Sequence, residues 1–129
     1  MLDSLTLTAP DLAPVLAFYD AALPPLGFER VAELVDEEED GAPVEAVGWG
    51  AAGRDATVWI VAGAGPTTGL HLRFRADSAV QVETFHAAAV QGGGVTFTAP
   101  RRWAIYRRGE FNAIVRDPLG NLVEAVAPE

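Results

Sequence analysis

The sequence predicts an α+β fold in which two βαβββ modules pair into one curved, cup-like sheet. The main observation is an internal repeat: the segment from Ser4, SLTLTAPDLAPVLAFYDAALPPLG, matches the segment from His71, HLRFRADSAVQVETFHAAAVQGGG, without a gap. Each copy begins with the alternation of a strand, continues with the periodicity of an amphipathic helix and ends at a glycine. A four-stranded sheet this small leaves an apolar face uncovered, so we expect the two modules to pair.

The other elements follow in the same order in both halves. In the first half, a helix near Asp11–Leu23 precedes strands near Phe28–Val35, Val44–Trp49 and Ala56–Ala62. In the second half, a strand at Leu70–Arg75 and a helix near Ser78–Gln91 precede strands near Val95–Thr98, Phe111–Arg116 and Leu122–Ala127. The acidic run Asp36–Asp40 is expected to be a loop between strands. Residues 63–69, GAGPTTG, are expected to be a linker between modules 1–62 and 70–129 of one domain.

Composition excludes several classes of function. The chain has 129 residues, no cysteine and a net charge of −9. Disulfides, thiol catalysis and cysteine-based zinc sites are therefore excluded, and nucleic acid or an anionic membrane surface is a poor partner. The sequence has no run of about 18 apolar residues and no basic leader before an apolar segment. We expect a cytoplasmic protein.

The segment RDPLGNLVEAV, residues 116–126, combines a turn with a strand that carries a carboxylate. Pro118 presets φ, Gly120 accepts a positive φ, and the side chains of Asp117 and Asn121 can cap the bend. The strand that follows is apolar on both faces except for Glu124. An unpaired buried carboxylate costs several kcal/mol, so we expect Glu124 to have a partner.

The doubled βαβββ pattern, together with LAFYDAALPPLGF, FHAAAVQGGG and RDPLGNLVEAV, resembles the vicinal oxygen chelate superfamily. This group includes glyoxalase I, extradiol dioxygenases and the bleomycin- and fosfomycin-resistance proteins. The resemblance implies a divalent metal in the cup (Fe, Mn, Ni or Zn), held by residues from the first and last strands of the two modules. In the second module His71 and Glu124 occupy those positions, and Glu124 is also the expected catalytic residue. In the first module Ser4 stands where a histidine is expected, and Thr57 or Trp59 stands at the last-strand position.

Strand alternation gives Glu124 a second candidate partner. His71, Arg73 and Arg75 share one face of their strand, and the resemblance implies that this face lines the cup. Arg73 could pair with the Glu124 carboxylate without any metal, or could hold an anionic ligand. We expect the cup to bind a small molecule through residues that include Ser4, Thr6, Trp59, Arg73, Trp103 and Tyr106.

Two functions remain open from the sequence. One is a metal-dependent lyase, isomerase or dioxygenase that acts on a small oxygen-bearing substrate through His71 and Glu124. The other is metal-independent binding or sequestration of a small molecule, favoured by the missing ligands in the first module and by the supply of aromatic residues. In either case we expect a homodimer, because small sheets with exposed edges gain by pairing.

Overall fold

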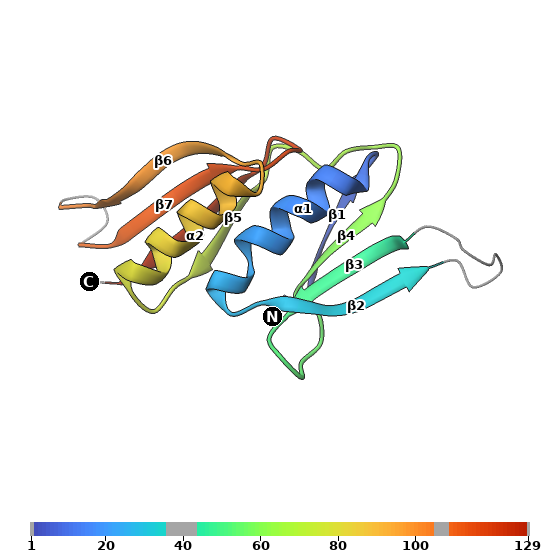
Figure 1. Cartoon of the computed structure of the whole chain (residues 1–129), viewed down its shortest axis with the longest axis horizontal. Coiled ribbons are helices and arrows are strands. Elements are labelled where there is room, and N and C mark those ends of the chain that lie inside the picture. The colour runs from blue at the N-terminus through green and yellow to red at the C-terminus, as the bar shows by residue number, and fades with distance from the viewer. Residues whose placement is uncertain (1, 36–43, 105–108, 129) are drawn as a thin grey trace.

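The computed structural model describes residues 2–35, 44–104 and 109–128, which form two four-stranded sheets and two α-helices (Figure 1). The first sheet contains β1 (Leu5–Ala9), β2 (Glu29–Val35), β3 (Val44–Gly50) and β4 (Val58–Ala62). The second sheet contains β5 (His71–Arg75), β6 (Val95–Arg102), β7 (Phe111–Arg116) and β8 (Leu122–Ala127). Helix α1 spans Leu12–Ala22 and α2 spans Ala79–Gln91, and a short 3-10 helix, η1, covers Pro24–Leu26.

The two sheets have the same topology, which confirms the predicted repeat of βαβββ modules. The strand order is β1-β4-β3-β2 in the first sheet and β5-β8-β7-β6 in the second. In each module the first strand pairs in parallel with the last, and the remaining neighbours are antiparallel. The described residues form two separate sheets and do not close into a barrel.

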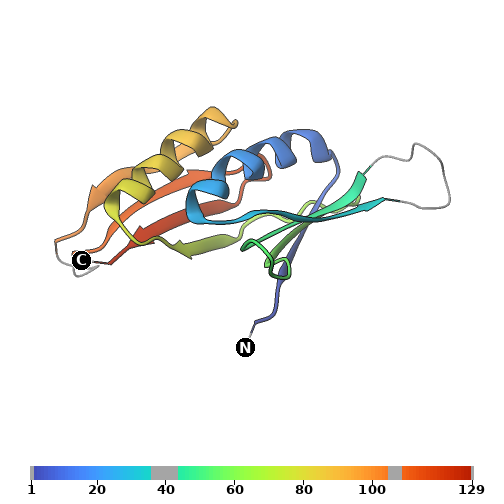
Figure 2. The same cartoon turned by 60° about the horizontal axis from the view of Figure 1, so that its bottom comes forward.

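Both helices lie on the same side of the sheets and side by side, as Figures 1 and 2 show. The core is the layer between helices and strands, and it includes Phe18 of α1, Phe85 of α2 and Val115 of β7. The opposite side of both sheets carries no helix (Figure 2). Strand alternation places His71 and Arg73 on that uncovered side, because Leu72 and Phe74 between and after them pack against the core. We call this side the open face.

Most element boundaries agree with the sequence prediction to within two residues, and three of those that differ have a clear local reason. The expected helix starts, Asp11 and Ser78, are the N-cap positions of α1 and α2, and the Ser78 side chain accepts a hydrogen bond of 3.2 Å from the Gln81 backbone N–H. Strand β6 continues to Arg102, four residues beyond the expected end and through Pro100. An edge strand tolerates proline because one side of it makes no ladder bonds, and the register shifts around this position. The prediction for Asp36–Asp40 lies outside the described residues.

The turn between β7 and β8 has the predicted chemistry. Gly120 adopts φ 90°, and Asp117 Oδ1 accepts hydrogen bonds from the backbone N–H groups of Leu119 (2.9 Å) and Asn121 (2.8 Å). Asn121 also reaches outside the turn, because its Oδ1 accepts from the Leu70 N–H at 3.0 Å and its Nδ2 donates to the Thr67 carbonyl at 2.9 Å. The turn therefore fixes the end of the inter-module segment against the second sheet. No helix in the described ranges has the length and hydropathy of a membrane span.

Candidate functional site

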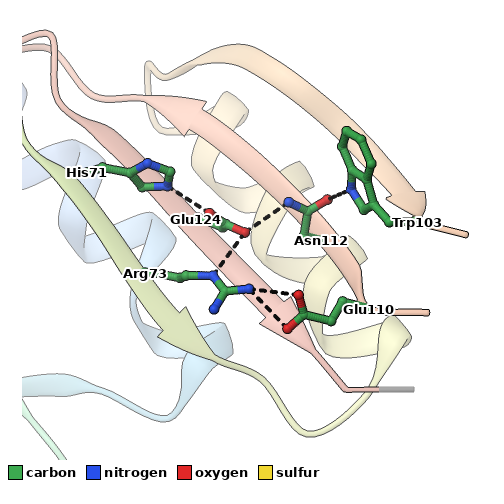
Figure 3. A network of polar contacts seen from close by, with 6 residues as sticks. All are labelled: His71, Arg73, Trp103, Glu110, Asn112 and Glu124. Carbon is green, nitrogen blue, oxygen red and sulfur yellow. Dashed lines mark hydrogen bonds and ion pairs between the residues drawn. The ribbon is translucent and has the colours of Figure 1, made fainter. Parts of the chain in front are cut away.

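The carboxylate of Glu124 is the centre of a polar network on the open face of the second sheet (Figure 3). Its side chain is completely buried. Oε1 lies 2.7 Å from Nε2 of His71, and Oε2 accepts a hydrogen bond of 2.9 Å from Nδ2 of Asn112. Arg73 Nε approaches the same Oε2 at 3.4 Å. The structure thus brings together the three residues, His71, Arg73 and Glu124, that the sequence analysis associated with one another.

The register of the sheet explains why these side chains converge. Strand β8 lies between β5 and β7, and Glu124 is directly opposite Arg73 on β5. Cross-strand partners point to the same side of a sheet, and so do residues two apart on a strand. His71 and Arg73 therefore flank Glu124 from β5, and Asn112 reaches it diagonally from β7, where its own cross-strand partner on β8 is Val126.

The network extends beyond Glu124 in two directions. Nη2 of Arg73 lies 3.0 Å from each carboxylate oxygen of Glu110, and Nε1 of Trp103 donates to Oδ1 of Asn112 at 2.6 Å. Partial burial lowers the pKa of Arg73, but the carboxylates of Glu124 and Glu110 outweigh this effect and hold the pKa above its usual value. The guanidinium of Arg101 lies 4.1 Å above the Trp103 ring, a cation–π contact.

The network combines a buried acceptor with donors that solvent can reach. The side chains of His71 and Arg73 are 43% and 46% exposed, whereas those of Glu124 and Asn112 are 0% exposed. Water or a bound molecule therefore has access to the imidazole and the guanidinium, both of which contact Glu124, and Glu124 is in turn held by Asn112. Such an arrangement can orient a polar ligand by hydrogen bonds and can accept a proton through the His71–Glu124 pair.

Asn112 and Glu110 were not among the residues predicted from the sequence. Asn112 had a detectable signal, because it interrupts the apolar run of β7 as Glu124 interrupts that of β8. Two polar residues within neighbouring buried strands predict a shared hydrogen bond when the hairpin register is known. Glu110 precedes β7 and gave no such signal.

The other predicted ligand-binding residues that the structure describes lie in two places, one in each module. Ser4 and Trp59 line two adjoining hollows on the first sheet, of about 380 and 340 Å³, and Thr6 lines the second of these. Trp103 directly follows β6 of the second sheet and belongs to the Glu124 network. Tyr106 lies outside the described residues. The predicted set therefore combines residues from both modules, because the repeat in the sequence does not show how the modules sit relative to one another.

The donor set around Glu124 is incomplete for the metal that the family resemblance implies. His71 and Glu124 are suitable ligand types, but residues 2–35, 44–104 and 109–128 contain no cluster of three or more His, Cys, Asp or Glu side chains able to hold an ion. Catalytic zinc sites use three protein ligands. The guanidinium beside Glu124 also disfavours a second cation at the same oxygen. The described residues of one chain therefore do not fit a complete metal site.

Comparison with known proteins gives one consistent result. The sequence matches the Glyoxalase/Bleomycin resistance protein/Dioxygenase superfamily over residues 1–125. A glyoxalase/bleomycin resistance protein from Albidiferax ferrireducens T118 superposes with a TM-score of 0.75 at 25% identity, covering 98% of this chain and 97% of that one. A glyoxalase/bleomycin resistance protein/dioxygenase family enzyme from Burkholderia phytofirmans PsJN gives 0.68 at 16% identity, with 98% of both chains covered. TioX from Micromonospora sp. ML1 gives 0.67 at 14% identity, again with 98% of both. No protein with curated function matches the sequence.

Proposed function

The chain belongs to the Glyoxalase/Bleomycin resistance protein/Dioxygenase superfamily, and within it we propose that this protein binds a small polar molecule on its open face. The observation that supports this proposal is the Glu124 network. Its buried members, Glu124 and Asn112, position two donors, His71 and Arg73, that remain accessible. A buried ionic network is often no more stabilising than apolar packing of the same volume, so stability alone is a weak reason for it.

Binding without a metal is the version of this function that the donor set favours. Glu124 already receives hydrogen bonds from Arg73 and Asn112, and its remaining oxygen lies against His71. A ligand hydroxyl or carbonyl can be held by the exposed imidazole and guanidinium edges. The hollows beside Ser4, Thr6 and Trp59 provide further contact area on the first sheet.

The test is a small-molecule screen by thermal shift on chelator-treated protein, followed by titration of each hit. We expect hits whose affinity falls by about tenfold or more in Glu124→Gln and Asn112→Ala, because each change removes hydrogen bonds that orient the exposed donors. Thr84→Ala on the exposed face of α2 is the matched control and should leave affinity unchanged. Hits that bind all four proteins equally, or no hits at all, would contradict the proposal.

A metal-dependent lyase, isomerase or dioxygenase reaction is the second candidate, favoured by the 2.7 Å approach of His71 Nε2 to Glu124 Oε1. Titration of chelator-treated protein with Mn(II), Ni(II) and Zn(II) separates the two candidates. Stoichiometric binding that is lost in both His71→Ala and Glu124→Gln would establish the metal-dependent version. Weak binding that neither substitution changes would support binding without a metal.

We propose that the protein acts as a homodimer. The two modules have opposite electrostatic character, because residues 1–62 carry 12 acidic residues and 2 Arg, whereas residues 70–129 carry 6 acidic residues and 7 Arg. Exposed apolar side chains lie on one edge strand of each sheet: Leu34 and Val35 on β2, and Val95 and Phe97 on β6. Contact between the first module of one copy and the second module of another would pair the opposite charges and bury the exposed apolar side chains.

Sedimentation at tens of micromolar tests the homodimer. We expect a dimer whose affinity falls as the salt concentration rises, and a monomer near 13.6 kDa would contradict the proposal.

A further inference from the structure

The open face of the second sheet contains a separate hollow beside the Glu124 network. It has a volume of about 180 Å³ and is lined by Arg73, Arg75, Glu110, Val126 and Pro128. Arg73 and Glu110 belong both to this hollow and to the network, so the two are contiguous. Val126 is 7% exposed and provides an apolar floor, and Pro128 provides an apolar side.

Arg75 is the arginine of this hollow that forms no ion pair with a described residue. It lies two residues beyond Arg73 on β5, on the same face, and directly opposite Val126. Arg73 uses Nε toward Glu124 and Nη2 toward Glu110. By contrast, no carboxylate of the described residues lies within ion-pair distance of Arg75. The complete guanidinium fork of Arg75 is therefore available to a ligand in the described structure.

The local charge balance favours an anion. Of the charged residues that line the hollow, Arg73 and Arg75 are positive and Glu110 is negative. This surplus of positive charge occurs in a chain whose net charge is −9. A planar guanidinium matches the two oxygens of a carboxylate in a bidentate arrangement, and the apolar floor suits the hydrocarbon part of an organic acid.

We propose that Arg75 is the anchor of a subsite for a small organic carboxylate. The carboxylate binds the guanidinium of Arg75, and the apolar part of the ligand packs on Val126 and Pro128. This inference rests on the proposed function in one respect: a polar group at the other end of the ligand would reach His71 and Glu124. It deepens that function by assigning the ligand to the class of small organic acids.

The experiment is an NMR titration of the full chain, observing the arginine Nε–Hε signals, with butyrate as the probe and butyramide as its neutral counterpart. Chloride at equal ionic strength controls for screening. We expect saturable shifts of the Arg75 signal with butyrate up to about 50 mM, since one small carboxylate gives only weak affinity, and no saturation with butyramide. Arg75→Gln should weaken butyrate binding about tenfold or more, and Arg75→Lys should recover only part of it. Arg116→Gln, on an exposed position at the end of β7, should bind as the wild type does.

The results of these titrations test the carboxylate subsite at Arg75 separately from small-molecule binding at the Glu124 network. Butyrate binding that is equal in wild type and Arg75→Gln, or a response in wild type that does not saturate, overturns the subsite. Glu124→Gln is expected to retain butyrate binding at Arg75, because the probe is too short to need the network. Loss of screening hits in Glu124→Gln with no butyrate response at Arg75 would support the proposed function and reject only the carboxylate subsite.

Discussion

His71 Nε2 and Glu124 Oε1 lie 2.7 Å apart across the parallel pair β5–β8, although the His71 side chain is 43% exposed and that of Glu124 is completely buried. One member of the pair is therefore in contact with solvent, and the other lies inside the second sheet. Because only one end is accessible, substitutions at the two ends, and at the residues that support them, should have different consequences. Substitutions at the buried members should lower both the free energy of unfolding and ligand affinity, because these residues also orient the exposed ones, whereas substitutions at the exposed members should affect mainly binding.

Asn112→Ala should lower the free energy of unfolding by about 2–3 kcal/mol. The substitution removes the 2.9 Å donor to Glu124 and the 2.6 Å acceptor of Trp103 Nε1, and it does so in a fully buried position. Losing a partner of a buried charged group costs more than losing an ordinary hydrogen bond. Urea denaturation measures the change, with Thr84→Ala as a surface reference expected within about 0.5 kcal/mol of wild type. Equal stability of the two variants would show that Asn112 does not support Glu124.

Arg73→Ala should cost only about 1 kcal/mol. Removing one partner of a fully buried ion pair costs about 3–5 kcal/mol, but Arg73 is 46% exposed and its Nε is 3.4 Å from Glu124. Glu124 also retains its contacts with His71 and Asn112. The same urea denaturation series tests this order. If Arg73→Ala were more destabilising than Asn112→Ala, the guanidinium would be the main partner of Glu124 and our ranking of the donors would be wrong.

The repeat in the sequence aligns Gly27 with Gly94, but the structure requires glycine at these positions for different reasons. Gly27 has φ +90° and open space around it, whereas a Cβ on Gly94 would lie 2.6 Å from the Phe18 ring and would also overlap Val115. Gly27→Asn should therefore cost less than about 1 kcal/mol, because asparagine adopts the left-handed conformation most readily among the other residues. Gly94→Ala should cost about 2–3 kcal/mol through overpacking between α1 and the second sheet. Thermal or urea melts that show the reverse order would contradict this assignment.

Much of the fold was predictable because the same signals occur twice. The gapless match from Ser4 and His71 predicts two modules, and the RDPLGN turn predicts how β7 and β8 connect. The partners of Glu124 on β5 were also predictable, since alternation places His71 and Arg73 on one face. These inferences need only local periodicity.

The remaining parts of the site depend on distances between elements that are far apart in the sequence. Asn112 reaches Glu124 diagonally across an antiparallel pair, which depends on hairpin register. Glu110 meets Arg73 although 37 residues separate them, because β5 and the start of β7 lie on either side of β8. Trp59 and Trp103 looked equivalent as aromatic residues, but Trp59 lies on β4 of the first module and Trp103 follows β6 of the second. Periodicity contains no information about such placements.

A side-chain hydrogen bond connects the first module to the β7–β8 turn. The phenol of Tyr19 on α1 donates a hydrogen bond of 2.6 Å to Oδ2 of Asp117, which joins residues 98 positions apart. Burial, followed by the negative charge and hydrogen bond of Asp117, raises the pKa of Tyr19 well above its ordinary value of 10.0. The folded state therefore keeps the phenolic proton at pH values where the unfolded chain begins to lose it.

The sign of the effect on stability follows from this proton difference. Because the pKa of Tyr19 is higher in the folded state, the contribution of this group is fully present below about pH 10 and is lost as the pH rises through the folded-state pKa. Tyr19→Phe should cost about 1–2 kcal/mol near neutral pH, through loss of the hydrogen bond to a charged acceptor. Above pH 10 the difference in free energy of unfolding between wild type and variant should become smaller, because only the wild type loses this contribution.

Urea denaturation of both proteins between about pH 7 and 11 measures this difference. Tyr106 is present in both proteins, so its titration cancels. A gap that stays constant across this range would show that Tyr19 titrates alike in both states, and that the contact with Asp117 does not hold the modules together as described.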